Sequence, residues 1–251
     1  MVYLWFILGT ILGSFYLVVA TRLPLKEDIV FSRSHCDNCK VILKWYQLIP
    51  IFSYVFSFGK CPKCKKNIPI INLLIEIITG LLFAIMYLRY NISYEFFTGL
   101  IISSLAIIIF VSDFKYLIIL DSPLIISSIL IIILKFIYFG SIAASKAFLS
   151  GIFLFVVMYL IGLLGNKLFN KESLGGGDIK LAFVIGLILG IRLGLVSIIL
   201  ATFLALPVSL TEIMSTKNNE VPFGPFLIGS LFVIFVFMSK FSNLLNFLFS
   251  L

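Results

Sequence analysis

The sequence predicts an all-α polytopic membrane protein with about eight transmembrane helices and one long polar loop between the first two. Two observations predict this class. The chain of 251 residues is 61% hydrophobic and only 12% charged, whereas about a quarter of the residues in soluble domains are charged. Its apolar residues also gather into runs of about 20, the length that a helix needs to cross a bilayer.

The apolar runs follow one another along the chain and define the expected spans. The run 179–210 is too long for one comfortable span, and the segment 190–194, which has a glycine at each end, divides it into two helices. A single tilted helix there would make seven spans instead of eight. The expected runs are 2–20, 70–90, 96–111, 116–138, 146–168, 179–210 and 223–237.

This division predicts a first transmembrane helix (1–20), a polar loop (21–69) and a transmembrane domain (70–251). The net charge of +8 is concentrated in the loop, which carries +6 by itself. The positive-inside rule places such a loop in the cytosol, so residue 1 lies outside. With eight spans, the segments 112–115, 169–178 and 211–222 also face the cytosol. The first run lacks a basic region before it, which indicates a retained anchor. The positive charge of the loop is explained by its position on the cytosolic side of a lipid bilayer, so we expect no nucleic acid partner.

All four cysteines lie in this loop. Cys36 and Cys39 form one C-x2-C pair, and Cys61 and Cys64 form a second. Two such pairs are typical of zinc knuckles, because together they complete a tetrahedral four-sulfur shell. That shell leaves no open position for water, so we expect a structural zinc in a cytosolic zinc-knuckle loop. A cytosolic loop disfavours disulfides; a loop without metal is the alternative. His35 is expected to be a surface group rather than a ligand.

A glycine triplet precedes a carboxylate at the start of the sixth run. Gly175, Gly176 and Gly177 lack a Cβ, which permits positive φ and a close approach of other atoms. Asp178 follows them at the expected membrane boundary, where an ionisable side chain is costly and indicates a functional site. The alternative is an aspartate that caps a helix after a flexible turn.

A second carboxylate, Asp113, ends the third run. That run leads toward the cytosolic side and the sixth leads away from it, so we expect Asp113 and Asp178 at about the same depth. Two neighbouring carboxylates do not ionise together easily, so one stays protonated. The ionised one can activate water while the protonated one polarises a carbonyl group. The pair therefore predicts an aspartic dyad for hydrolysis that requires no metal.

Two other acids compete for the place of Asp113. Asp121 would lie deeper in the fourth run or cap a helix before Ser122 and Pro123. Glu76 lies inside the second run, where the alternatives are a pair with an inward lysine and a buried hydrogen-bonded acid. A transporter or channel also uses membrane carboxylates and broken helices, but it pairs them near the midplane. A non-catalytic membrane adaptor with a zinc loop gives no reason for two acids at matched depth.

Short motifs are spread over nearly the whole chain. They are Gly13-Ser14-Phe15, Arg22-Leu23-Pro24, Ser34–Cys39, Ile49–Tyr54, Cys61–Cys64, Glu76 with Thr79-Gly80, Gly175–Leu181 and Val221–Phe226. In type and order they resemble the motifs of the type IV prepilin leader peptidases, which are GxGD-type membrane aspartic proteases. Two departures are Leu120 before Asp121, where the family often has proline, and Ile70-Ile71-Asn72, where relatives commonly carry an Arg-Tyr-Pro-like sequence.

The resemblance implies an enzyme of the bacterial inner membrane whose active site faces the cytosol. Its catalytic pair would be Asp113 and Asp178, with Gly175–Gly177 and Lys180 shaping the substrate site. Its substrates would be type IV prepilin or pseudopilin precursors, cut at the cytosolic membrane edge to remove a short basic leader. Family members often also methylate the new N-terminal amine with S-adenosylmethionine. The sequence has no Rossmann-type glycine turn, so no residues are assigned to that cofactor.

Overall fold

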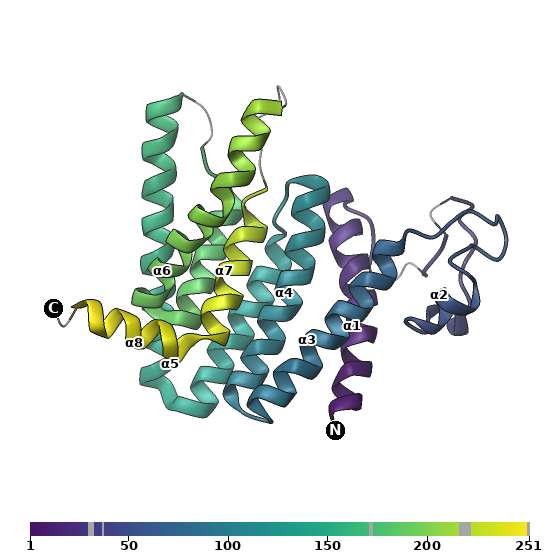
Figure 1. The fold of residues 1–251 in the computed structure, drawn as a ribbon, viewed down its shortest axis with the longest axis horizontal. Coiled ribbons are helices and arrows are strands. Elements are labelled where there is room, and N and C mark those ends of the chain that lie inside the picture. Colours follow the sequence, from purple (N-terminus) through teal and green to yellow (C-terminus); the bar gives the residue numbers. More distant parts are fainter. Residues whose placement is uncertain (30–32, 37, 171–172, 216–221, 250–251) are drawn as a thin grey trace. The chain divides into compact units, whose positions relative to one another are not determined.

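The computed structural model describes residues 1–29, 33–36, 38–170, 173–215 and 222–249, and it is almost entirely helical (Figure 1). The described residues contain two isolated β-bridges and otherwise no strand pairing. This confirms the all-α expectation. The long helices are α1 (Val2–Arg22), α3 (Ile70–Tyr90), α4 (Tyr94–Tyr116), α5 (Asp121–Phe169) and α6 (Gly176–Ser215), and the shorter ones are η1 (Leu23–Leu25), η2 (Trp45–Leu48), α2 (Phe52–Phe56), α7 (Gly224–Val236) and α8 (Met238–Phe249).

Several of these helices have the length and composition of membrane spans. Within the described residues, five helices qualify, and the bent pair α7 and α8 would make a sixth. The chain is therefore a multi-pass membrane protein. The last expected run, 223–237, corresponds to α7, and the chain bends by 85° between α7 and α8. The expected number of eight spans stays a prediction.

Two of the five long helices are each interrupted at one glycine. Gly140 in α5 has φ 83° and ψ 179°, and Gly190 in α6 has φ 75° and ψ −175°. Both conformations lie outside the helical region, and glycine adopts them without steric cost. Figure 1 shows α5 turning back on itself where the chain is interrupted. The sequence analysis placed a break in each of these two regions, between the fourth and fifth runs and at 190–194.

The chain forms two compact units, residues 1–96 and 97–251. In the first unit, α1 packs against α3. Gly9 and Gly13 on α1 lie so close to α3 that added Cβ atoms would come to 2.7 Å from Thr79 and, for Gly9, to 2.8 Å from Gly80. Small residues at this spacing let two membrane helices approach closely. Thr79 and Gly80 of the motif that contains Glu76 therefore hold α1 and α3 together.

In the second unit, α6 packs against both α5 and α7. The first half of α6 is buried, with Leu181, Ile185 and Leu187 fully inaccessible. Farther along, the Ser197 hydroxyl is 2.9 Å from the Ser230 hydroxyl of α7, and both are buried. Ser230 also donates to the carbonyl of Leu227 in its own helix at 2.9 Å, so its hydroxyl accepts from Ser197 and the pair joins α6 to α7.

Candidate active site and metal centre

Asp178 lies in the first turn of α6, which begins at Gly176. Its side chain is buried, and its carboxylate accepts a hydrogen bond from the backbone N–H of Gly175, just before the helix. A carboxylate at this position satisfies one of the free N–H groups of a helix start. Among the described residues, however, Oδ1 of Asp178 has no hydrogen-bond partner. One oxygen is thus anchored, and the other is buried and uncommitted.

Asp113 lies near the end of α4 and is also buried, with 5% of its surface exposed. The backbone N–H of Gly224 donates a hydrogen bond to Oδ2 of Asp113 at 3.0 Å. Gly224 is the first residue of α7, so the carboxylate lies at the positive end of that helix, where an anion is stabilised. Asp113 is therefore anchored at one oxygen in the same manner as Asp178.

The two carboxylates are brought near each other by the segment between α4 and α5. A Cβ placed on Gly177 would lie 2.6 Å from Cβ of Ile119, and one placed on Gly224 would lie 2.7 Å from Cδ1 of the same side chain. Ile119 therefore fills the space between the glycine that precedes Asp178 and the glycine that binds Asp113. Asp113 and Asp178 are close enough to interact electrostatically.

Two glycines of the triplet leave room for neighbouring side chains to come close to the backbone. Positive φ among the described glycines occurs at Gly59, Gly140 and Gly190, so the triplet does not use the left-handed conformation that the sequence allowed. Gly177 leaves room for Ile119, and Gly175 lies against the Asp178 carboxylate, 3.0 Å from Oδ2 to an added Cβ. A Cβ on Gly176 would meet nothing within 4 Å. The helix start beside Asp178 is therefore open at Gly176.

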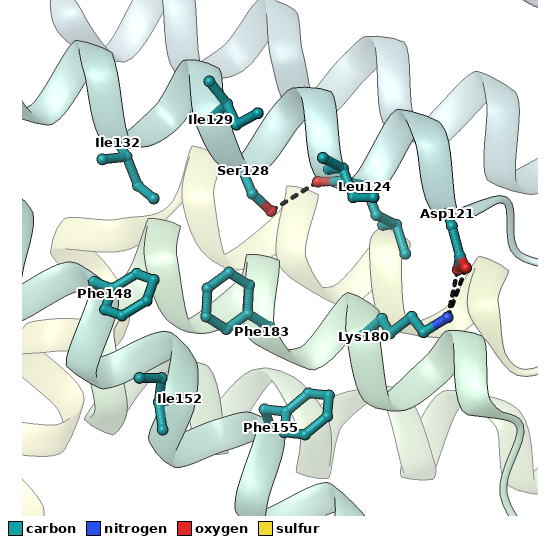
Figure 2. Close-up of a pocket in the computed structure, with 11 residues that line it drawn as sticks. Asp121, Leu124, Ser128, Ile129, Ile132, Phe148, Ile152, Phe155, Lys180 and Phe183 are labelled. Atoms are coloured by element: carbon teal, nitrogen blue, oxygen red, sulfur yellow. Dashed lines mark hydrogen bonds and ion pairs between the residues drawn. The ribbon is translucent and has the colours of Figure 1, made fainter.

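Lys180 does not interact with the carboxylate pair. Its ammonium lies 2.7 Å from each carboxylate oxygen of Asp121 (Figure 2), and both side chains are about half exposed. Asp121 is the first residue of α5, and the N-cap is Leu120, without a side-chain cap hydrogen bond, so Asp121 is not the helix cap that the alternative expected. The structure thus places Asp121 in an ion pair and leaves Asp113 as the buried partner of Asp178.

Glu76, the other competing acid, binds the polar loop. Its Oε2 accepts a hydrogen bond from the backbone N–H of Ile51 at 2.7 Å. Ile51 has φ 62° and ψ −56°, and Phe52 N–H donates to the carbonyl of Pro50 at 2.6 Å. These values describe a γ-turn with positive φ, which is rare and strained, especially for a β-branched residue. Glu76 is a hydrogen-bonded acid that holds this turn.

The two cysteine pairs fold into turns of the same form. The backbone N–H of Cys36 donates to Val41, and that of Cys61 donates to Lys66, at 3.0 and 2.9 Å. Lys40 and Lys65 have positive φ at matching positions. An isolated β-bridge closes each turn, one between residues 35 and 42 and one between residues 60 and 67. Each turn directs two thiols toward the other turn.

The four sulfur atoms lie within 4.8 Å of one another, with Sγ–Sγ distances of 3.9 Å for Cys36–Cys64 and for Cys39–Cys61. Tetrahedral zinc with bonds of 2.3 Å needs sulfur atoms about 3.8 Å apart. A backbone hydrogen bond at Lys66, followed by the side chain of Asn38, lowers the pKa of the Cys64 thiol to about 6. The cluster therefore fits a metal ion, and its donors are compatible with zinc. His35 is not part of this four-sulfur group.

Two residues of the site were missed by the sequence analysis. Ile119 carries no chemical group that would single it out in a run of apolar residues. Gly224 was noted only within the motif Val221–Phe226. A glycine directly before Pro225, at the expected membrane boundary, is a helix-start signal, and the free N–H groups of helix starts bind carboxylates. The helix start at Gly224 therefore indicates a binding position for an acidic side chain, but the sequence does not say which acid occupies it.

Comparison with known proteins finds similar sequences over most of the chain. Residues 100–210 match the model of the type IV leader peptidase family, and residues 7–90 match that of the bacterial peptidase A24 N-terminal domain. Curated relatives named prepilin leader peptidase/N-methyltransferase include one from Bacillus subtilis, 32% identical over 88% of this chain and 88% of its own. One from Vibrio cholerae is 28% identical over 92% of this chain and 95% of its own. No solved structure matches the chain.

Proposed function

Because this chain belongs to the type IV prepilin leader peptidase family, we propose that it is a membrane-embedded aspartic endopeptidase that removes the leader from type IV prepilin or pseudopilin precursors. The observation that supports this most strongly is the pair of buried carboxylates, each anchored at one oxygen, with Oδ1 of Asp178 uncommitted among the described residues. A buried acid pair of this kind is suited to proton transfer.

In the proposed mechanism, the ionised member of the pair takes a proton from a water molecule whose oxygen attacks the scissile carbonyl carbon. The protonated member donates a hydrogen bond, and then a proton, to the carbonyl oxygen. When the C–N bond breaks, the pair gives one proton to the leaving nitrogen and takes one proton back from a hydroxyl of the diol intermediate. A carboxylic acid and an amine are released, and the pair again holds one proton. The two side chains titrate as a unit, so the acid and the base are not assigned separately.

The proposed location of the cut follows from the physics of the bilayer. A peptide in the hydrocarbon region is helical, with its carbonyl groups in hydrogen bonds. At the cytosolic edge of the inner membrane the substrate can be extended and water is available. The open helix start at Gly176 would let the substrate backbone approach Asp178. We place the active site on this face of the membrane.

We further propose that the cysteines hold a structural zinc ion. Cys36, Cys39, Cys61 and Cys64 would bind it, and the ion would supply the cross-link that keeps the two turns together. A four-thiolate shell has no position for water or substrate, so no step of the peptide cleavage is assigned to the metal.

The relatives' names combine the peptidase with an N-methyltransferase. As a second activity we propose methylation of the amine that cleavage frees, with S-adenosylmethionine as the donor. The amine is the product of the first reaction, so the second depends on it. None of the residues described above is assigned to the methyl donor.

Mass spectrometry of a matched precursor tests both activities together. The purified protein in nanodiscs is incubated with the precursor, with and without S-adenosylmethionine. We expect loss of the leader in both samples and one added methyl group only with the donor.

Asp113→Asn and Asp178→Asn should each lower the cleavage rate by a factor of about 10² to 10⁴, the usual contribution of an acid–base group. Glu95→Gln, at the other end of α4 and exposed, is the matched control. Full cleavage by either Asp variant would contradict the proposal.

A further inference from the structure

The segment between the two cysteine turns exposes large apolar side chains that have no part in the mechanism above. Three aromatic side chains are the most exposed, with 78% of Trp45, 79% of Phe56 and 88% of Phe58 accessible. Exposed apolar surface that is contiguous marks a site of interaction with a protein or a membrane. We call this surface the loop patch, and it consists of Trp45, Tyr46, Leu48, Ile49, Phe52, Val55, Phe56 and Phe58.

The short helix α2 gives the loop patch a defined outer face. Phe52, Val55 and Phe56 recur at helical spacing and so lie on one side of α2, where all three are exposed. The opposite side of α2 binds the protein, because the hydroxyl of Tyr54 donates to the carbonyl of Ile68 at 3.3 Å. The apolar face of α2 is therefore directed away from the part of the loop that holds the helix.

The contacts of this segment lie at the start of a membrane span. Ile68, which accepts the hydrogen bond of Tyr54, also donates its backbone N–H to the carbonyl of Gly59 at 2.7 Å. Two residues later α3 begins at Ile70, and α3 has the length and composition to cross a membrane. The loop patch is thus held beside the point where the chain enters the bilayer.

A second contact sets the depth of the segment. Glu76, which binds the backbone N–H of Ile51, lies about 9 Å along the axis from the start of α3 at Ile70. The whole of α3 is about 32 Å long, close to the hydrocarbon thickness of about 30 Å. Because helical side chains lean toward the helix start, the turn at Ile51 lies near the boundary between hydrocarbon and headgroups.

We infer that the loop patch inserts into the membrane interface and anchors the cysteine loop to a bilayer that contains anionic phospholipids. Tryptophan and tyrosine are enriched at this level of membrane proteins, where a ring leaves water while its polar group stays hydrated. The inference goes beyond the peptidase activity, because it needs only the membrane helices α1 and α3 on either side of the loop.

The charges around the loop patch favour lipid over the proposed substrate. From residue 38 to residue 75 the chain has six lysines and no acidic residue. Exposed lysines next to apolar side chains are typical of segments that bind a membrane surface, since anionic headgroups attract them. The basic leader of a prepilin would instead be repelled. The lysines, all exposed, are Lys40, Lys44, Lys60, Lys63, Lys65 and Lys66.

Quenching of tryptophan fluorescence tests the anchor. Trp5→Phe leaves Trp45 as the only tryptophan, and this variant is placed in nanodiscs of phosphatidylglycerol and phosphatidylcholine with or without brominated acyl chains. We expect the brominated lipids to quench Trp45, and we expect Phe52→Ser combined with Phe56→Ser to recover its emission. Ile42→Ser is the matched control, because it removes an exposed apolar side chain of the first cysteine turn, outside the loop patch. It should leave the quenching unchanged.

A cross-link identifies what covers the loop patch. A photoreactive p-benzoylphenylalanine in place of Phe56 should form lipid adducts in the same nanodiscs, whereas the same probe in place of Tyr54, on the bound side of α2, should react within the loop. An adduct of position 56 with residues 97–251, or with an added precursor but no lipid, would overturn the inference. Emission of Trp45 that brominated lipids do not change would also overturn it. A protein that docks in this way but does not cut the precursor would overturn the proposed function alone.

Discussion

At the scale of single residues, the carboxylate pair depends on neighbours that carry no charge. Gly224 and Gly175 supply backbone N–H groups to Asp113 and Asp178, and Ile119 fills the space between Gly177 and Gly224. A glycine is needed at 177 because the Cβ atom of any other residue would overlap with Ile119. The position of Asp178 therefore follows from contacts of its neighbours as well as from its own hydrogen bond.

Gly177→Ala and Gly176→Ala should differ sharply, although both change a glycine of the same helix turn to alanine. At 177 the new Cβ would lie 2.6 Å from Ile119, whereas at 176 nothing lies within 4 Å. Overpacking of this kind costs about 1–3 kcal/mol, so the melting temperature of Gly177→Ala should fall and that of Gly176→Ala should not. Adding Ile119→Gly to Gly177→Ala removes the Cβ that the new side chain meets, and it should recover part of the loss. Equal melting temperatures for the two single variants would contradict the packing.

The sequence was sufficient to single out Asp113, Asp178 and the cysteines, because acidic and thiol side chains are rare in a chain that is 12% charged with four cysteines. It could not assign Lys180. A lysine near a carboxylate motif favours an interaction with it, but the partner is Asp121, which is 59 positions away. Pairing over that distance depends on how α5 and α6 pack, and local spacing carries no information about it.

At the scale of elements, the cysteine loop consists of two equal turns rather than one irregular segment. Each turn closes by a β-bridge and by a hydrogen bond to the first cysteine. Neither turn buries enough apolar surface to be stable alone, since isolated short turns are marginal in water. The metal cross-link between them would then provide most of the stability of the loop.

The zinc proposal predicts about one zinc ion per chain by metal analysis, from the four ligands of one tetrahedral site. Cys61→Ser removes the buried ligand and should abolish the metal, and a chelator should do the same in the wild-type protein. In both cases trypsin should cleave faster at the loop lysines. His35→Ala is the control, because His35 is not in the four-sulfur group, and it should keep its zinc. A metal-free wild-type protein, isolated without chelators, would refute the assignment.

The γ-turn at Ile51 makes a second prediction at this scale. Backbone strain of this kind costs about 1–3 kcal/mol, and a hydrogen bond to a charged group contributes about 1.5–3 kcal/mol, so Glu76 is sufficient to offset it. Glu76→Ala should raise the hydrogen-exchange rate of the Ile51 amide at least about tenfold, and Glu76→Gln should raise it less because an acceptor remains. Glu95→Ala, an exposed acid on α4, is the control. Unchanged exchange in Glu76→Ala would show that Glu76 does not hold the turn.

Element boundaries show what periodicity and length can predict. Apolar runs located α1 and α3 nearly to the residue, since a bilayer requires spans of about 20 residues. The end of α4 and the start of α5 were less accurate. The third run was expected to end at 111 and the fourth to begin at 116, whereas α4 ends at Tyr116 and α5 begins at Asp121. Residues 117–120 are apolar and read as part of a span, but they form the segment that carries Ile119. At a membrane edge, an apolar residue is compatible both with a loop packed against the protein and with a helix in the lipid. Apolar composition alone therefore does not locate the helix boundary.

At the scale of the whole molecule, the two glycine breaks decide how often the chain crosses the membrane. An unbroken α5 would be about 73 Å long and an unbroken α6 about 60 Å, against a hydrocarbon core of about 30 Å. The break at Gly140 leaves a first half of about 28 Å and a second of about 43 Å, each sufficient for one crossing. The break at Gly190 leaves a first half of α6 of about 21 Å and a second half of about 38 Å, and the first half is shorter than the hydrocarbon core. The break at Gly140 therefore favours separate spans on its two sides, whereas two crossings by α6, as the arrangement with eight crossings needs, stay a prediction.

Labelling from outside intact cells tests this arrangement. With residue 1 outside and eight spans, Ile92→Cys and Ser141→Cys should react with a membrane-impermeant maleimide, because both positions are exposed and follow an even number of crossings. Thr211→Cys should stay unlabelled, as should the native cysteines, because these lie on the cytosolic side. If α6 crosses only once, Thr211→Cys becomes reactive while Ser141→Cys remains so. If α5 crosses only once, residues 173–175 move outside and bring the start of α6 with them, which would place Asp178 away from a cytosolic leader.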